Sequence, residues 1–94
     1  MSAVERADVG DVTVRYWAAL RAAAGTPADR VPPGQLDEVL AGVAASHADR
    51  PRFAQVLAIC SVLVDEQQVV TRDPADVVVG PGSVVDLLPP FAGG

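Results

Sequence analysis

The chain of 94 residues is predicted to fold as one α+β domain in which one main helix packs across one mixed sheet. Three patterns predict this class. Apolar residues between positions 36 and 47 recur at intervals of three and four, as on one face of a helix. Residues 12–17 alternate with a period of two, as in a half-buried strand. Apart from Ser83 and Asp86, residues 83–88 are strongly apolar, as in a strand that is covered on both faces.

The amino-terminal part is predicted to hold a leader, a strand, a short helix and a second strand. Residues 1–10 are polar and unpatterned, so we expect a disordered leader. The strand at residues 12–17 is followed by an alanine-rich helix at residues 18–24, which Gly25 would end as its C-cap. A weak second strand at residues 29–33 ends in two prolines, which suit only the edge of a sheet.

The main helix is predicted at residues 36–47. Asp37 and Glu38 lie in its first turn, where the helix dipole favours negative charge, and Pro51 blocks its continuation. His47 is the only histidine and has no evident partner in the sequence. We therefore expect it to cap or pack beside the end of the helix, and not to bind a metal or act in catalysis. The apolar stripe comprises Leu36, Val39, Leu40, Val43, Ala44 and His47.

A hairpin is predicted after the main helix. Residues 53–64 are largely apolar and could form a short helical turn that leads into a strand. The polar run at residues 65–68 would then be the turn between strands at residues 61–64 and 69–71.

The last strand is predicted to lie in the middle of the sheet. A short strand at residues 77–79 and a tight turn at residues 80–82 lead into residues 83–88. If Val85 and Leu87 face the helix, the other side chains form a partly apolar outer face, which suggests an interface. The residues on that outer face are Val84, Asp86 and Leu88.

Composition excludes several classes of function. The net charge of −5 comes from twelve acidic and seven basic residues, which argues against nucleic-acid binding and favours partners with basic surfaces. The single cysteine, Cys60, lies in an apolar run and is expected to be a packed, unreactive thiol. We find no apolar run of ~20 residues and no secretory signal, so we expect a cytoplasmic protein without a membrane partner.

The sequence ends on Gly93 and Gly94 after the paired prolines Pro89 and Pro90. Glycine lacks a Cβ atom, so such an end is thin enough to enter a narrow channel, and the prolines keep it from pairing in a sheet. We expect a folded domain at residues 11–88 and a flexible tail that reaches roughly 20 Å when extended and presents its α-carboxylate as a chemical group. The alternative is an ordinary disordered terminus.

Three segments carry a resemblance to a known family: residues 12–25, the loop at residues 79–85, which is similar to the family's Gly-Asp-x-Val turn, and residues 88–94. On these segments the chain resembles the ubiquitin-like β-grasp sulfur carriers, most closely the small subunit of molybdopterin synthase. The resemblance implies a β-grasp fold, with a mixed sheet of about five strands on one main helix and a flexible Gly-Gly tail.

The resemblance also implies chemistry at Gly94. An adenylating enzyme resembling the ubiquitin-activating enzymes would transfer AMP from ATP to its carboxylate, and a persulfide donor protein would supply the sulfur that makes a thiocarboxylate. ATP and magnesium would belong to that partner, because this chain has no phosphate-binding loop motif. The chain would bind no cofactor or metal and would be no enzyme by itself. It would be the sulfur-donating small subunit beside the large catalytic subunit of molybdopterin synthase.

The predicted site residues lie at this terminus and just before it. Gly93 and Gly94 would be the reactive end, and Phe91 would be the main anchor in a partner. Pro90, Leu88 and Ala92 would complete the partner-binding set. Alternatively, Leu88 and Phe91 fold back onto the domain as core residues.

Other functions remain open at this stage. A carrier for thiamine or cysteine biosynthesis would use the same terminus, and a ubiquitin-like modifier would join Gly94 to lysines of target proteins. In a plain β-grasp binding module, removal of Gly94 would change nothing.

Overall fold

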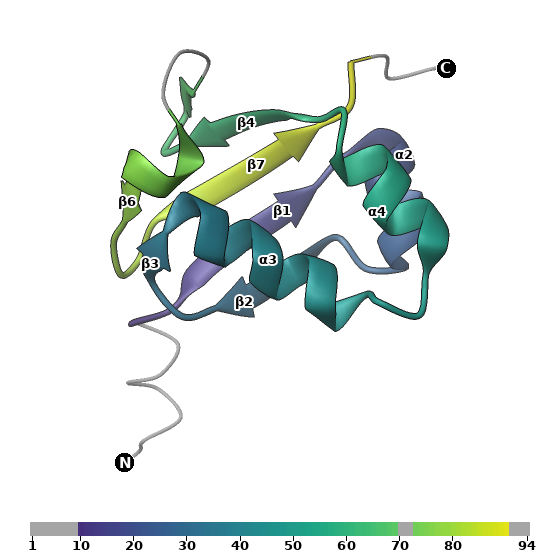
Figure 1. Cartoon of the computed structure of the whole chain (residues 1–94), viewed down its shortest axis with the longest axis horizontal. Helices are drawn as coiled ribbons and strands as arrows, with labels where there is room; N and C mark the ends of the chain where they lie inside the picture. Colours follow the sequence, from purple (N-terminus) through teal and green to yellow (C-terminus); the bar gives the residue numbers. More distant parts are fainter. Residues whose placement is uncertain (1–9, 70–72, 91–94) are drawn as a thin grey trace.

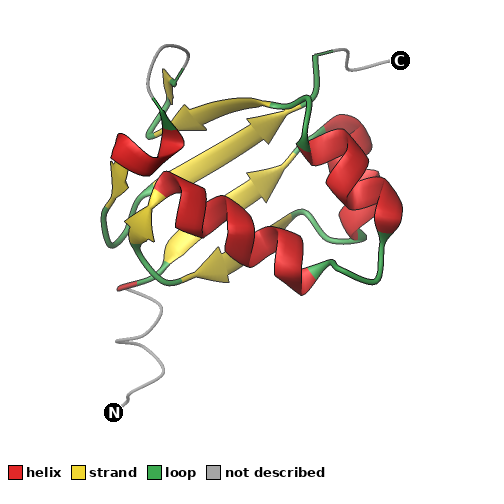
Figure 2. Cartoon of the chain, in the orientation of Figure 1, coloured by secondary structure: helices red, strands yellow, loops and turns green. Residues whose placement is uncertain are grey.

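A computed structural model describes residues 10–69 and 73–90, and the elements in these ranges form a mixed sheet with α-helices against it (Figures 1 and 2). The helices are α2 (Ala18–Ala24), α3 (Leu36–Ser46) and α4 (Pro51–Leu57), with a 3₁₀ turn η1 (Pro74–Asp76). The strands are β1 (Val12–Tyr16), β2 (Ala28–Val31), β3 (Gly34–Gln35), β4 (Ser61–Val64), β5 (Gln67–Gln68), β6 (Val78–Val79) and β7 (Val84–Leu88).

The last strand lies in the middle of the main sheet, as predicted. The strand order is β2-β1-β7-β4-β5, with β1 and β7 parallel and the other neighbouring pairs antiparallel. Strand β2 is at the edge, and Pro32 and Pro33 follow it. The α+β class and the β-grasp arrangement are therefore confirmed. A second, two-stranded sheet of β3 and β6 was not predicted; in it Gly34 pairs with Val79.

The main helix begins and ends where the apolar spacing predicts. Its start is fixed by a capping box, in which the backbone N–H of Gln35 donates to Oε1 of Glu38 at 3.0 Å. His47 is the C-cap residue, and Pro51 is the first residue of α4. The helical turn expected within residues 53–64 is thus a complete short helix that begins two residues earlier. Proline suits this position, because the first N–H of a helix has no partner within it.

The short helix α2 also matches its prediction. Gly25 ends it in the left-handed region, with φ 76°, and its N–H donates to the carbonyl of Arg21 at 3.0 Å. Leu20 and Ala24, which are four residues apart, are both buried. Helices α2 and α4 pack against each other near the ends of β1 and β7 (Figure 1).

The predicted hairpin has the wrong turn. A four-residue turn was expected at residues 65–68, whereas the structure turns in two residues, Asp65 and Glu66, with φ of 50° and 71°. Two left-handed residues in succession give the twist that a tight hairpin needs, but Asn-Gly is the usual signal for it. The second strand is therefore β5, two residues earlier than expected, and Val69 still donates to the carbonyl of Val62 at 3.0 Å.

Side chains of the sheet that point toward the helices are buried to different degrees. Those of β1 and β7 are at most 1% exposed, whereas those of β4 remain partly exposed. Figure 1 shows the reason, because α3 crosses the sheet in front of β1 and β2 while β4 lies beyond it. The sealed residues are Val12, Val14, Tyr16, Val85 and Leu87, and the partly exposed ones are Val62 and Val64.

Several expectations fall on residues outside the described ranges. These are the disordered leader, apart from Gly10, the end of the expected strand at residues 69–71, and the tail beyond Pro90. In the parts of the chain that the structure describes, we find no helix with the length and apolar character needed to cross a bilayer.

Candidate functional site

The candidate site is the open face of the main sheet, where β7 leads into the tail. Val85 and Leu87 point into the core and are fully buried, so the alternate residues of β7 face away from the helices. Among the predicted partner-binding residues, Leu88 is partly exposed and Pro90 is exposed. Leu88 ends β7 opposite Ser61 of β4. The remaining predicted site residues, Phe91, Ala92, Gly93 and Gly94, lie outside the described residues.

Three side chains form a compact group on this face, which we call the Asp86 cluster. Arg15 donates two hydrogen bonds to the Asp86 carboxylate, from Nε to Oδ1 at 2.6 Å and from Nη2 to Oδ2 at 2.9 Å. The indole Nε1 of Trp17 donates to the same Oδ1 at 2.9 Å. The group follows from the parallel pairing of β1 and β7, which places Arg15 opposite Asp86. Asp86 is covered as a result, with its side chain only 6% exposed.

The electrostatics of the cluster favour its charged form. The hydrogen bonds from Arg15, assisted by the one from Trp17, hold the pKa of Asp86 below its usual value, although burial opposes them. The same bond raises the pKa of Arg15. The carboxylate is therefore ionised at neutral pH, and the two-point pairing with a guanidinium fixes its orientation.

Trp17 lies on the surface of this cluster and is oriented by its hydrogen bond to Asp86. Its side chain is 41% exposed, and the guanidinium carbon of Arg15 lies 5.6 Å from its ring centroid, within range of a cation–π contact. The next residue, Ala18, has a φ of 49°, a conformation that costs a non-glycine residue about 1–2 kcal/mol. This sharp turn joins β1 to α2 without a loop. An exposed, pre-oriented tryptophan is typical of the residues that dominate protein interfaces.

The Asp86 cluster was not predicted from the sequence, although part of its signal was present. The alternation in residues 12–17 places Arg15 and Trp17 on one face, opposite Val14. Asp86 was correctly placed on the outer face of the last strand. The parallel register between β1 and β7, which brings these side chains together, could not be predicted from the sequence.

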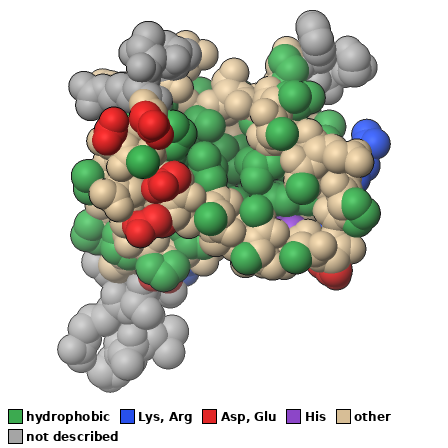
Figure 3. All heavy atoms as spheres, viewed as in Figure 1, with side chains coloured by type: hydrophobic (Ala, Val, Ile, Leu, Met, Phe, Trp, Pro, Cys, Tyr) green, Lys and Arg blue, Asp and Glu red, His purple; other side chains and the backbone are tan. Residues whose placement is uncertain are grey.

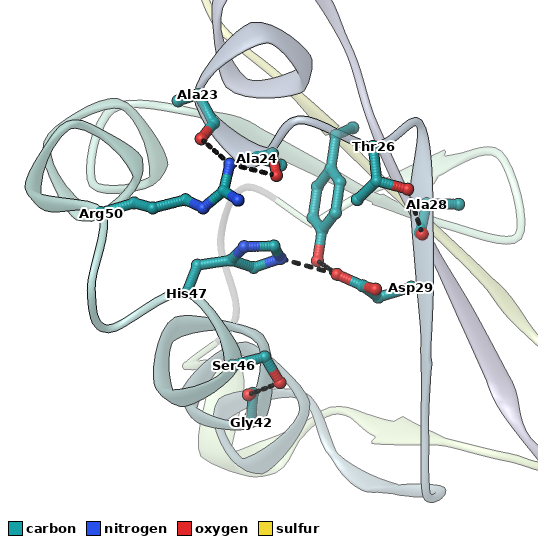
Figure 4. Close-up of polar contacts among 10 residues, drawn as sticks. Ala23, Ala24, Thr26, Ala28, Asp29, Gly42, Ser46, His47 and Arg50 are labelled. Carbon is teal, nitrogen blue, oxygen red and sulfur yellow. Dashed lines mark hydrogen bonds and ion pairs between the residues drawn. The ribbon is translucent and has the colours of Figure 1, made fainter.

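His47 belongs to a separate, structural network on the helix side of the sheet (Figure 4). Its Nε2 lies 2.7 Å from Oδ2 of Asp29, which also accepts a hydrogen bond from the Tyr16 hydroxyl at 2.8 Å. The imidazole stacks on Phe53 with ring centroids 4.4 Å apart. The prediction that His47 packs beside the end of the helix is confirmed, but it has a partner that the sequence did not reveal. Burial, with the bond to Asp29, raises the pKa of Tyr16.

Arg50 makes a further structural contact in the same region (Figure 4). Its Nη1 donates to the carbonyl of Ala24 at 2.8 Å, at the end of α2. A Cβ atom on Gly25 would lie 2.7 Å from this nitrogen, so a larger residue would displace the Arg50 guanidinium, and the φ of 76° favours glycine at this position.

Cys60 has the properties expected of a packed thiol. It is partly buried, and its Sγ donates to the carbonyl of Val56 at 3.3 Å. Burial raises its pKa to about 11, so the thiol is protonated and a poor nucleophile at neutral pH. Within residues 10–69 and 73–90, no three His, Cys, Asp or Glu side chains are placed to hold a metal ion.

Comparison with known proteins supports the fold. No protein-family model and no curated protein sequence matches the chain. Its structure is similar to small archaeal modifier protein 1 from Methanosarcina acetivorans, with a TM-score of 0.72, 20% identity, and coverage of 90% of this chain and 97% of that one. It is also similar to a putative molybdopterin converting factor subunit 1 from Pyrococcus furiosus, with a TM-score of 0.69, 22% identity, and coverage of 87% and 99%.

A third similar structure is a complex of subunits 1 and 2 of the molybdopterin-converting factor from Helicobacter pylori. The matched chain has a TM-score of 0.64 and 20% identity, with coverage of 89% of this chain and 99% of that one. The resemblance drawn from the sequence is thus confirmed at the level of the fold, which the chain shares with both modifiers and converting-factor subunits.

Proposed function

We propose that the chain is a ubiquitin-like sulfur carrier that donates sulfur from a Gly94 thiocarboxylate in molybdopterin biosynthesis. The observation that carries this proposal is the course of β7. The buried central strand leads, through Leu88 and the paired prolines, into a Gly-Gly end, within a fold shared with converting-factor subunits. A strand held between two neighbours gives the reactive end a fixed origin.

The chemistry requires a separate activating enzyme. A carboxylate resists attack by a nucleophile because its charge is delocalised over two oxygens. Transfer of AMP from ATP to the Gly94 carboxylate gives an acyl-adenylate and releases pyrophosphate. Sulfide then displaces AMP and leaves the thiocarboxylate directly. A persulfide displaces AMP to form an acyl disulfide, and a thiol of the sulfur donor protein then attacks its S–S bond, which releases the thiocarboxylate and leaves a disulfide on the donor. ATP and magnesium belong to the activating partner, and the chain acts as a carrier and not as an enzyme. We expect these reactions in the cytoplasm.

The Asp86 cluster and the tail are the proposed docking surface for both partners. A large catalytic subunit is one expected partner, which the solved complex of the two Helicobacter pylori subunits supports. Trp17, Leu88 and Phe91 supply apolar anchors, and Pro90 and Ala92 complete the proposed contacts.

Intact mass spectrometry tests the reaction. The purified chain is incubated with an activating enzyme, ATP, magnesium and a sulfur donor, and a gain of about 16 Da is expected as oxygen is exchanged for sulfur. A chain that lacks Gly94 is the control and should not gain this mass. Sulfur delivery that persists without Gly94 would contradict the proposal.

Conjugation to proteins is the second candidate, favoured by the similarity to small archaeal modifier protein 1. It predicts high-mass products joined through lysines of other proteins, instead of the thiocarboxylate. Carriers for thiamine or cysteine biosynthesis would give the same mass gain. They are distinguished by the large subunit that co-purifies with the chain.

Substitution of Trp17 tests the docking surface. Trp17→Ala should weaken binding to the activating enzyme about tenfold or more, because it removes an exposed aromatic anchor. Val78→Ala is the matched control, since Val78 is 75% exposed but lies on β6, away from the tail. Equal affinity of the two variants for the activating enzyme would show that Trp17 is not part of the interface.

A further inference from the structure

The helix side of the sheet carries an apolar surface that is separate from the Asp86 cluster. We call it the β4 groove. It exists because the layer of helices stops before β4, whose inward-facing side chains therefore stay partly exposed. The side chains around it come from α3, α4, β4 and the segments on either side of η1. They are Leu40, Leu57, Val62, Val64, Val69 and Val77, all partly buried and packed against the core.

The surface view shows how charge is arranged beside this groove. In Figure 3 hydrophobic side chains gather in the middle of the helix face, between α3 and α4, and acidic side chains lie along the side where η1 packs against α3. The acidic rim is made of exposed residues on or next to these two elements. They are Asp37, Glu38, Asp73 and Asp76.

We propose that the β4 groove binds an amphipathic, basic helix of a partner protein. A helix laid beside α3 would complete the layer over β4 and bury the aliphatic side chains that the chain itself leaves partly open. Lysine or arginine residues on the rim side of that helix would face the acidic rim. The net charge of −5 adds to the attraction for a basic segment.

This surface lies on the opposite side of the main sheet from the Asp86 cluster. Val62 and Val64 pack against the core on the helix side, whereas Leu63 between them faces the Asp86 cluster side. A partner in the groove therefore leaves the open face accessible, so the chain could be held on one side while the other side meets the proposed partners of the sulfur chemistry.

Nuclear magnetic resonance with a synthetic helix tests the proposal. The probe is an acetylated and amidated peptide with leucines at helical spacings of three and four on one face and lysines on the other. Added to the isotopically labelled full chain, it should shift the amide signals of Leu40, Val62, Val64 and Val77. A peptide with glutamate in place of each lysine should bind at least about tenfold more weakly, because it meets the acidic rim with like charge.

Two neighbouring substitutions provide a matched control. Val64→Asn should weaken binding of the lysine peptide about tenfold, because it places a polar group in the groove. Leu63→Asn, on the opposite face of the same strand, should leave the affinity unchanged. Dispersed amide spectra establish that both variants are folded. An Asp73→Asn, Asp76→Asn double variant should bind more weakly and lose part of its salt dependence.

Three results would overturn the proposal. One is equal affinity for the lysine and glutamate peptides, and another is a shift pattern centred on Arg15, Trp17 and Asp86. The third is binding that appears only after residues 91–94 are removed, which would mean that the chain's own tail occupies the groove. None of these outcomes depends on whether Gly94 is converted to a thiocarboxylate, so the proposed function is tested separately.

Discussion

The two sides of β7 differ in how completely helices cover their neighbours. On one side lies β1, whose inward residues Val12 and Val14 are fully buried. On the other lies β4, whose inward residues Val62 and Val64 stay partly exposed. The same residue type in the same sheet thus meets two environments. This difference shows that an apolar strand pattern does not by itself determine how far its side chains are buried. Burial also depends on which strands the helices pack against. We interpret the buried side chains around β1 as the source of stability and the β4 groove as a binding surface.

The largest expected effect comes from a pair of residues that lie opposite each other across this boundary. Leu87 is 0% exposed and pairs with Val62. Leu87→Ala should reduce the free energy of unfolding by about 3 kcal/mol, because it removes buried methyl groups and leaves a cavity. Val62→Ala should cost about 1 kcal/mol, because its side chain is already partly solvated. Urea denaturation measures both. Equal costs would show that β4 is sealed and that the β4 groove does not exist.

The next largest effect is expected from the hydrogen-bond network of Asp29 with Tyr16 and His47. Asp29→Ala removes the acceptor for both Tyr16 and His47, which are 1% and 9% exposed. Leaving buried polar groups unpaired should reduce the free energy of unfolding by about 2 kcal/mol. Thermal unfolding, followed by circular dichroism, measures the loss. Asp49→Ala, at an exposed carboxylate, is the control. A loss no larger than that of the control would mean that the network adds nothing to stability.

A smaller loss in the free energy of unfolding, which depends on pH, is expected from a substitution in the Asp86 cluster. The pKa of Asp86 is lowered in the folded state, chiefly by its hydrogen bond from Arg15. Its contribution is therefore fully present above the unfolded pKa of about 3.9, and is lost as the pH falls through the lower folded pKa. Asp86→Asn should cost about 1 kcal/mol at pH 7. The difference from the unsubstituted chain should shrink below about pH 4, and a difference that grows on acidification would contradict the assigned pairing.

The smallest change in the free energy of unfolding is expected from a substitution in β6, at the edge of the core. Val78 is 75% exposed, whereas its neighbour Val79 is 0% exposed. Val78→Ala should change the free energy of unfolding by less than about 0.5 kcal/mol, because little apolar surface is buried there. Chemical denaturation of the single variant is sufficient. A larger loss would place the boundary of the core beyond β6.

The sequence predicted the elements that depend on local patterns. The spacing of apolar residues located α3, Gly25 marked the end of α2, and the prolines after β2 placed that strand at an edge. Elements that depend on distant contacts were missed or shifted. The two-residue turn at Asp65 and Glu66 lacks the usual glycine, and the pairing of β3 with β6 rests on only two residues in each strand.

The candidate site was predictable only in part, for a similar reason. The tail and its partner-binding residues were proposed from composition and position alone, and they stay a prediction, because Phe91 to Gly94 lie outside the described residues. The Asp86 cluster could not, since Trp17 and Asp86 are 69 positions apart and meet only through the register of β1 and β7. The β4 groove depends on which strand α3 leaves uncovered, and that is a property of the assembled layers.

The central position of β7 also has a consequence for how the chain folds. This strand comes last along the described sequence, yet its contacts with β1 join residues 71 positions apart, as between Arg15 and Asp86. Such distant pairing requires a large loop to close before any contact forms, and it slows folding relative to helical proteins. Until β7 is inserted, β1 and β4 each have an unpaired edge that can associate with other chains. Cleavage before residue 84 would return the molecule to that aggregation-prone state.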